Sequence, residues 1–321
     1  MSAPLVSICI PAYNASRWIG ESVTSSFAQT LDDVEVLVVD NASTDETAEI
    51  ARSHADPRLR IVVNETNLGA VRNFNRCAAL ARGRYVKYLH ADDVLYPSCC
   101  ERMTALLDEE PRVGLVFAPR DVLLEDPDDP VEQAWRERYG VLHARFSSLE
   151  RVNDGRRLFR EWLEAGVHEN LVGEPTAVMV RRECLERVGG FNPTLWQLVD
   201  VEMWLRILLH YDVGFLPEPL CAYRHHESSS TAGVARGSLD WLDALWVLER
   251  LLCESLSEEE RRVVQGLRRA QVRRTLRGLA GRLVRGDRRL GPFFAWARYR
   301  ATLPARREPI FAQPVPPPPA G

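Results

Sequence analysis

Two adjacent carboxylates, Asp92 and Asp93, follow a largely apolar run that begins at Tyr85. A buried strand with paired acids at its carboxyl end favours a site for a hard divalent cation, which binds oxygen ligands and also holds phosphate oxygens. The alternative is a helix N-cap, because Asp favours that position and Pro97 follows shortly afterwards. The pair alone leaves both interpretations open.

Three more polar segments stand where short apolar runs end, at residues 11–14, 40–45 and 64–69. The runs before them are typical of buried strands. Ligands of parallel α/β sheets lie beyond the carboxyl ends of the strands, so we expect these segments and residues 90–93 to converge on one rim. Asn67 and Gly69 form either a turn with a positive φ or a helix start that faces phosphates.

Asp40 ends the second of these strands. Asp40 has two possible roles. Its carboxylate accepts hydrogen bonds from a base or ribose, or it forms an Asx-type turn in which Ser43 or Thr44 caps the next helix. No GxGxxG motif follows the first strand, which disfavours a dinucleotide-binding fold. The segment 11–14 also lacks the Gly-rich basic loop of sugar-phosphate nucleotidyltransferases.

Two later motifs carry ionisable groups. Asp200 opens an expected helix, where an N-cap is the default role of an isolated Asp. Glu202 is expected to face solvent. His225 and His226 follow a short strand; lone histidines are usually structural, but an adjacent pair can place one on a metal or phosphate.

The elements that position these residues alternate between strands and helices of about 10–12 residues, which indicates βαβ units on a mostly parallel sheet. The predicted strands are 5–10 (stopped by Pro11), 34–40, 59–63, 85–89, 113–118, 176–181 and 220–224. The predicted helices are 18–28, 44–53, 70–81, 97–109, 153–165, 183–188 and 201–210. The acidic segment 121–139 is predicted to be a mobile surface loop.

The chain has 321 residues, enough for one α/β domain and an appendage. Its seven Cys show no CxxC spacing, and no signal segment precedes them, so we expect reduced thiols in a cytoplasmic protein. Apolar stretches stay well below the ~18 residues of a membrane span, so none is expected.

Seven motifs follow one another along residues 4 to 230. They are VSICIPAYN at 6–14, EVLVVDNASTD at 35–45, NLG at 67–69, LHADD at 89–93, GGF at 189–191, Asp200 before WLR at 204–206, and YRHH at 223–226. Together and in this order they resemble glycosyltransferase family 2, whose members have the GT-A nucleotide-sugar fold.

The resemblance implies a nucleoside-diphosphate-sugar site, a divalent cation and a general base. It assigns the donor to Pro11, Ala12, Tyr13, Asp40, Asn67 and Asp92. It assigns Mg²⁺ or Mn²⁺ on the diphosphate to Asp93, with His226 as a metal or phosphate contact, and the general base to Asp200. One base with in-line attack inverts the anomeric centre, so an inverting transferase is expected. His90 and Val199 depart from the family pattern, because an acid is common at both positions.

The resemblance and the composition predict four regions. Residues 1–118 form the nucleotide-sugar-binding half and 119–235 the acceptor half of a GT-A domain. Residues 236–302 form a basic helical region, with expected helices at 239–252 and 261–284, and 303–321 a Pro-rich disordered tail. Between residues 261 and 307 there are fifteen Arg and one acid, a charge of about +14. This region is either a solvated face packed on the acidic body or a surface for anionic lipid. Nucleic acid is not expected.

We therefore predict transfer of a sugar to a glycan or lipid-linked acceptor, in polysaccharide or glycolipid assembly at the inner face of the membrane. The alternative is a non-catalytic scaffold that binds nucleotide-sugar. The acids Asp92, Asp93 and Asp200 disfavour that alternative. Donor binding without turnover would favour it.

Overall fold

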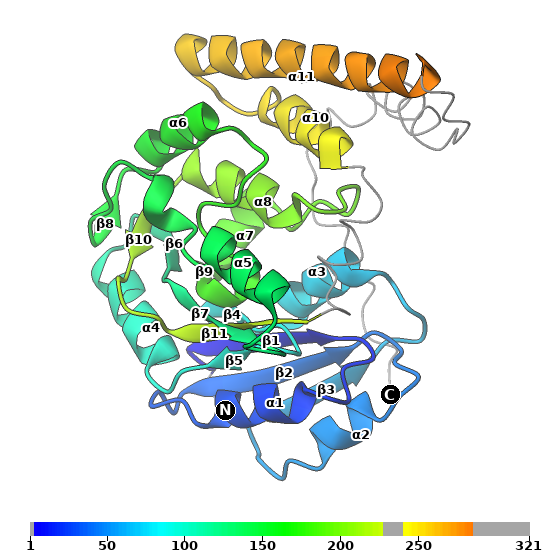
Figure 1. Cartoon of the computed structure of the whole chain (residues 1–321). Helices are drawn as coiled ribbons and strands as arrows, with labels where there is room; N and C mark the ends of the chain where they lie inside the picture. The colour runs from blue at the N-terminus through cyan, green and yellow to red at the C-terminus, as the bar shows by residue number, and fades with distance from the viewer. Residues whose placement is uncertain (1–2, 227–239, 285–321) are drawn as a thin grey trace.

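A sheet of eight strands forms the centre of the protein in the computed structural model, which describes residues 3–226 and 240–284 (Figure 1). In spatial order its strands are β3 (Leu59–Val63), β2 (Val34–Asp40), β1 (Val6–Ala12), β4 (Tyr85–Tyr88), β9 (Val178–Arg181), β6 (Val113–Phe117), β10 (Asp212–Phe215) and β8 (Val152–Asn153). A second sheet contains β5 (Val94–Leu95), β11 (Cys221–His225) and β7 (Arg120–Leu124).

The central sheet has a parallel half and a mixed half. Strands β3, β2, β1 and β4 are parallel neighbours, as expected from the βαβ rhythm. Strand β9 then runs antiparallel to both β4 and β6, and β10 returns parallel to β6. The carboxyl ends of the first four strands therefore meet at one edge.

Helices cover both sheets (Figure 1). They are α1 (Ile19–Phe27), α2 (Thr47–Arg52), α3 (Ala70–Leu80), α4 (Cys99–Glu109), α5 (Pro130–Tyr139), α6 (Gly155–Ala165), α7 (Arg182–Val188), α8 (Val199–Leu208), α10 (Asp240–Leu251) and α11 (Glu258–Val284). Two 3₁₀ turns, η1 (His143–Arg145) and η2 (Pro175–Ala177), complete the described elements. The α/β prediction is confirmed.

Strand β1 extends past the predicted stop at Pro11. It continues through Ala12, which pairs with Asp40 of β2. Pairing with β4 ends at Cys9, and the Cys9 carbonyl accepts there from Leu89 N. Because alternate residues point their N–H groups to the same side, the missing N–H of Pro11 faces this unpaired side and breaks no ladder bond.

The predicted mobile loop at 121–139 is wrong, because the segment forms β7 and α5. Asp129 caps α5 by accepting a hydrogen bond from Val131 N at 2.8 Å, and Pro130 stands in its first turn. The Arg120 guanidinium donates to the carbonyls of Tyr139 and Gly140, both at 2.9 Å, and so fixes the other end of the helix.

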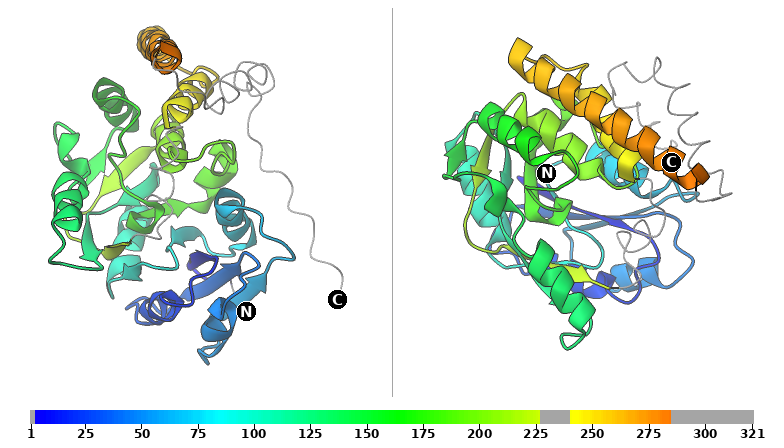
Figure 2. Two further views of the ribbon diagram at one scale, coloured as in Figure 1. Left: turned by 45° about the vertical axis from the view of Figure 1, so that its right-hand side comes forward. Right: turned by 45° about the horizontal axis from the view of Figure 1, so that its top comes forward.

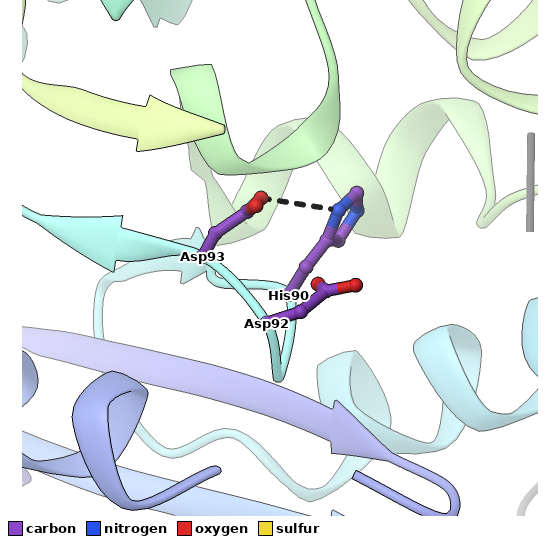
Figure 3. Close-up of side chains that lie close together, drawn as sticks. All are labelled: His90, Asp92 and Asp93. Atoms are coloured by element: carbon purple, nitrogen blue, oxygen red, sulfur yellow. Dashed lines mark ion pairs between the residues drawn. The ribbon is translucent and has the colours of Figure 1, made fainter. Parts of the chain in front are cut away.

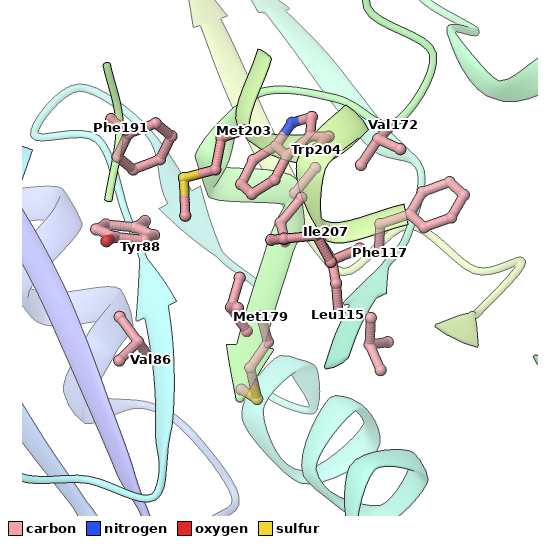
Figure 4. Packing of buried hydrophobic residues seen from close by; sticks show 14 of the residues in the cluster. Val86, Tyr88, Leu115, Phe117, Val172, Met179, Phe191, Met203, Trp204 and Ile207 are labelled. Carbon is pink, nitrogen blue, oxygen red and sulfur yellow. The ribbon is translucent and has the colours of Figure 1, made fainter. Parts of the chain in front are cut away.

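The core continues from the central sheet into α8. Figure 4 shows Met179 of β9 and Phe117 of β6 close to Trp204 and Ile207 of α8, all almost completely buried. Burial of each such side chain contributes about 1.5–3 kcal/mol, so α8 is held mainly by its apolar face. The position of α8 therefore depends on the packing of the whole core.

The helices α10 and α11 lie across α6 and α8, on the far side of the molecule from β2 and α2 (Figures 1 and 2). Leu245 and Leu248 of α10 belong to the same core as the strands. Ser257 and Glu260 form a reciprocal capping box, with N–H bonds of 2.8 and 3.2 Å, so α11 starts at Glu258.

Helix α11 shows a basic exposed face. It carries the exposed arginines Arg262, Arg269, Arg273, Arg274 and Arg277. Among the described residues, none of the helices combines the length and apolar character that crossing a bilayer requires. The rest of the predicted basic region, from residue 285, and the Pro-rich segment 303–321 lie outside the described residues.

Candidate active site

The polar loops after β1, β2 and β3 are joined by hydrogen bonds, as the convergence on one rim predicts. Asn14 N donates to Ser43 Oγ at 3.0 Å, and Thr44 N donates to Asn14 Oδ1 at 2.9 Å. Asn41 Nδ2 donates to Asn67 Oδ1 at 2.9 Å. These bonds couple three strand ends into one surface.

Asp40 lies inside this surface and is 1% exposed. Its carboxylate accepts from Ser43 N at 3.1 Å and from the Ser43 hydroxyl, which is the Asx-type turn that the sequence left open. The expected capping of α2 by Ser43 or Thr44 is wrong: its N-cap is Glu46, with no side-chain bond. Ala42 is left-handed, with φ 58°, a conformation that costs free energy and is held by the surrounding bonds.

The other predicted donor residues lie on the same rim. Pro11 and Ala12 belong to β1, and the Tyr13 side chain beyond them is 47% exposed. Asn67 Oδ1 also accepts from Gly69 N at 2.8 Å, and Gly69, with φ 84°, precedes α3. No side chain caps α3, so its first N–H groups can receive an anion.

His90, Asp92 and Asp93 form the group of potential metal ligands among the described residues (Figure 3). One ligand atom of each lies within 4.8 Å of the others. His90 Nδ1 is 3.3 Å from Asp93 Oδ2, as the dashed line in Figure 3 marks. The departure from the family pattern at position 90 thus places an imidazole beside the two carboxylates.

Asp93 is completely buried and accepts hydrogen bonds from two more segments. Thr176 Oγ1 donates to its Oδ2 at 2.6 Å, and Arg224 N donates to its Oδ1 at 2.9 Å. The Thr176 carbonyl in turn accepts from Lys87 Nζ, also fully buried. The prediction missed Thr176 and Lys87, and the sequence around them shows no pattern that marks them.

The ionisation of this group follows from its contacts. Burial lowers the pKa of His90, but the hydrogen bond and charge of Asp93 outweigh it and raise the pKa to about 9. Burial raises the pKa of Asp93 and outweighs the hydrogen bond from His90, which lowers it. For Asp92, burial raises the pKa, but the bond from His226 and the charge of His90 lower it overall.

His226 contacts Asp92, its Nε2 lying 3.0 Å from Asp92 Oδ2. This bond raises the pKa of His226. Arg224, two residues earlier on β11, donates from Nε to the Asp92 carbonyl at 2.9 Å and covers the Trp18 ring, with Cζ 4.1 Å from the centroid. The YRHH motif therefore attaches to the acidic turn through both Asp92 and Asp93.

Asp200 lies in the first turn of α8 and is half-buried. Asn170 Nδ2 donates to its Oδ2 at 2.7 Å, and Val201 N donates to its Oδ1 at 2.8 Å. It does not cap α8, because the N-cap residue is Leu198. Burial, followed by the negative charge of Glu174, raises the pKa of Asp200 to about 7.

The expected exposure of Glu202 is wrong, because this side chain is completely buried. Arg206, four residues later, donates to both carboxylate oxygens at 2.8 and 2.9 Å. Arg206 also donates to the carbonyl of Val188, just before the GGF motif, and to that of Gly190 within it. The pair therefore joins that motif to α8.

Glu174 and Arg120 connect this region to the second sheet. Arg120 donates to both carboxylate oxygens of Glu174, from Nε at 2.6 Å and from the NH2 nitrogen at 2.9 Å. Burial raises the pKa of Glu174, but the adjacent guanidinium lowers it overall, so this carboxylate stays charged. The negative charge of Glu174 contributes to the raised pKa of Asp200. Glu174 and Asn170 are both site residues that the sequence did not predict.

Comparison with known proteins agrees with this arrangement. The family model for glycosyl transferase family 2 matches residues 7–164. A Mycobacterium tuberculosis protein called uncharacterized protein MT1568 is 38% identical over 79% of this chain and 77% of its own. The chain belongs to glycosyltransferase family 2. An uncharacterized glycosyltransferase of Haemophilus influenzae is 24% identical over 72% of this chain and 68% of its own.

Solved structures share the fold of this glycosyltransferase. S. aureus TarS 1-349 in complex with UDP-GlcNAc has a TM-score of 0.64 at 16% identity, over 95% of this chain and 82% of its own. Mannosyltransferase PcManGT from Pyrobaculum calidifontis, in complex with GDP-Man and Mn²⁺, has a TM-score of 0.55 at 19% identity, over 95% of this chain and 86% of its own. The chain spans 41% of a longer TarS structure. The predicted GT-A type fold is confirmed.

Proposed function

We propose that this glycosyltransferase inverts the anomeric centre of a nucleoside-diphosphate-sugar, with Asp200 as the general base. The observation that carries the proposal is the state of Asp200. Its carboxylate is oriented by Asn170 and Val201, and its pKa is raised to about 7. A base with a pKa near the working pH combines ionisation with a strong affinity for the transferred proton.

The donor occupies the rim beyond β1 to β4 in this proposal. The exposed Tyr13 ring offers a stacking surface for the base, while Asp40 and Asn67 hold the nucleoside edge. Pro11 and Ala12 line the strand end, and Asp92, 30% exposed at its side chain, faces ribose and sugar. The complexes of TarS with UDP-GlcNAc and of PcManGT with GDP-Man support a nucleotide-sugar as the donor class.

The acidic turn fits a divalent cation by its chemistry, since two carboxylates and one imidazole lie within 4.8 Å. Asp93 would hold Mg²⁺ or Mn²⁺, with Asp92 and His90 beside it; His226 orients Asp92 and reaches a phosphate oxygen. When bound, the cation offsets the charge that develops on the departing nucleoside diphosphate. The Mn²⁺ complex of PcManGT supports this assignment.

Asp200 performs the step on the acceptor side. One of its carboxylate oxygens accepts the proton of an acceptor hydroxyl as that oxygen bonds to the anomeric carbon. The bond from the anomeric carbon to the diphosphate breaks, and its electron pair leaves with the nucleoside diphosphate. Attack opposite the leaving group inverts the configuration.

A thermal-shift panel tests the donor site. UDP, GDP, dTDP and their sugars are each added with Mn²⁺ or with EDTA, because a ligand that binds only the folded state raises Tm. A shift with one base that requires Mn²⁺ is expected, followed by release of the nucleoside diphosphate. Binding without release would support the scaffold alternative, and no shift with any nucleotide would overturn the donor site.

The acceptor in this proposal is a glycan or lipid-linked hydroxyl at an anionic membrane surface, used in polysaccharide or glycolipid assembly. The exposed arginine face of α11 supports it by charge complementarity. Substituting Arg262, Arg269 and Arg273 by Gln should lower binding to phosphatidylglycerol vesicles at low salt. Equal binding by both proteins would leave α11 a solvated face.

The division of labour along the chain is also a proposal. Residues 1–118 contain the donor rim and 119–235 contain Asp200, which supports a donor half and an acceptor half. The helical region from 236 follows, and its described helices pack on the acceptor half.

A further inference from the structure

We propose that Asp243 of α10 is a positioning residue for the reaction, acting through the start of α8. The inference rests on the proposed function, because α8 carries the general base in its first turn. Asp243 Oδ2 accepts hydrogen bonds from three successive backbone N–H groups, those of Trp196, Gln197 and Leu198, at 2.8, 2.6 and 3.1 Å. A residue of the C-terminal helices thereby holds the segment that leads into the base.

The contact lies just ahead of the first turn of α8, at the N-cap residue and the two residues before it, and so fixes the chain that enters α8. Its N-cap residue, Leu198, cannot accept a hydrogen bond through its side chain, and the first N–H groups of a helix have no partner within it. Asp200, the acid nearest to this end, accepts from Val201 N instead. A carboxylate at this end is also favoured by the helix dipole, which adds to the three charge-assisted bonds.

Because the contact is buried, the Asp243 carboxylate and the three N–H groups depend on one another as hydrogen-bond partners. Asp243 is 2% exposed, so its charge has lost most of its hydration and is compensated by the N–H groups. Removing the carboxylate leaves three inward-facing donors to be satisfied by a shift of the segment. Since Asp200 is two residues beyond Leu198, such a shift moves the base.

Helix α10 also contacts α8 one turn further on. Arg250 Nε lies 4.0 Å from Glu202 Oε1, and Glu202 is already paired with Arg206. The two contacts span the first turns of α8 from opposite ends of α10, so the helices are held in one relative orientation. The segment bonded to Asp243 also contains Trp196, a residue that is 57% exposed.

The effect of Asp243 therefore falls on transfer and leaves the donor rim unchanged. With Asp243→Ala we expect kcat for nucleoside diphosphate release to fall about 10- to 100-fold, because small misplacements of a catalytic group cost this much. The Kd and KM for the sugar nucleotide should stay within about twofold. Asp243→Asn keeps one oxygen acceptor and should recover most of kcat.

The test measures release of nucleoside diphosphate from the sugar nucleotide that the thermal-shift panel identifies, with water as acceptor. The matched control is Glu249→Gln, which removes another carboxylate of α10, 5% exposed, that pairs with Arg268 of α11. It should keep native kcat. Native kcat in Asp243→Ala, or an equal loss in Glu249→Gln, would overturn the inference.

Hydrogen exchange separates this inference from the proposed function. The amides of residues 196–201 should exchange faster in Asp243→Ala than in wild type, and at the wild-type rate in Glu249→Gln. If Asp200→Asn retains transfer, the base assignment fails while the exchange result still decides whether Asp243 holds α8. If Asp243→Ala does not bind donor, the donor affinity of Asp243→Asn is measured in its place. An affinity of Asp243→Asn below that of wild type would overturn the inference.

Discussion

The proposed donor rim and the segment around the proposed base, Asp200, are built in different ways. The rim takes its residues from the ends of β1 to β4, and the loops after β1, β2 and β3 bond to one another. The base segment takes Asp200 from α8, Asn170 from a loop and Asp243 from α10. The rim can therefore be inferred from motifs in chain order, whereas the base segment depends on long-range packing.

The largest expected effect comes from the base itself. Asp200→Asn keeps the bond from Val201 N and the volume of the side chain but cannot accept a proton. We expect kcat to fall about 10²- to 10⁴-fold while the Kd for donor stays native. Glu258→Gln, an exposed carboxylate on α11, serves as the control. Near-native turnover of Asp200→Asn would remove the functional distinction between the two regions.

Loss of charge on the rim should act on binding instead. Asp93→Asn keeps a group of the same size beside Thr176 but loses the negative charge. We expect donor affinity measured with Mn²⁺ by titration calorimetry to fall at least about tenfold, since loss of even the supporting contacts of a metal ligand costs this much. Affinity in EDTA should equal that of wild type. An unchanged dependence on Mn²⁺ would exclude Asp93 as a ligand.

The pKa of Asp200 predicts a pH profile. Because the base must be ionised to accept a proton, kcat/KM should fall about tenfold for each pH unit below about 7. The profile is measured from pH 5 to 8 with saturating Mn²⁺. A limb near the ordinary Asp pKa would contradict the raised pKa and with it the effect of partial burial on Asp200.

The raised pKa of Asp200 also makes the stability of the protein depend on pH. Asp200 has a folded pKa above its unfolded value, so its contribution to stability is present below pH 3.8 and is lost as the pH rises through about 7. Asp200→Asn has no such loss. Its free energy of unfolding relative to wild type should increase from pH 4 to 7 by on the order of 1–3 kcal/mol, allowing for partial exposure. A pH-independent difference in urea unfolding would contradict this.

The smallest effect is expected within the rim. Ser43→Ala removes a hydroxyl that donates to Asp40 and accepts from Asn14 N. One hydrogen bond contributes about 1 kcal/mol, so the Kd for donor should rise about fivefold. Ser53→Ala, which removes an exposed hydroxyl at the end of α2, is the control. Equal affinities in all three proteins would show that Asp40 is oriented without Ser43.

The sequence predicted the first four strands and the convergence of their loops, because apolar runs and turn residues act locally there. Strand β10 was missed, since DVGF is too short to show alternation and pairs only because β6 lies beside it. The burial of Glu202 has a local sign in the sequence, because Arg206 four residues later can pair with it on the same face of the helix. No local pattern links Asp243 to α8, because that bond exists only after the core has packed.

The hydrogen bonds from residues 196–198 to Asp243 have a consequence for synthesis. The contacts of the proposed donor rim are complete once the chain through His226 has emerged, and domains generally fold from the N-terminus as they are made. The segment that leads into α8 can form its bonds to Asp243 only after α10 has been made, so the proposed acceptor side is completed last. A chain interrupted before residue 243 would hold nucleotide-sugar before it has a base in place to use it.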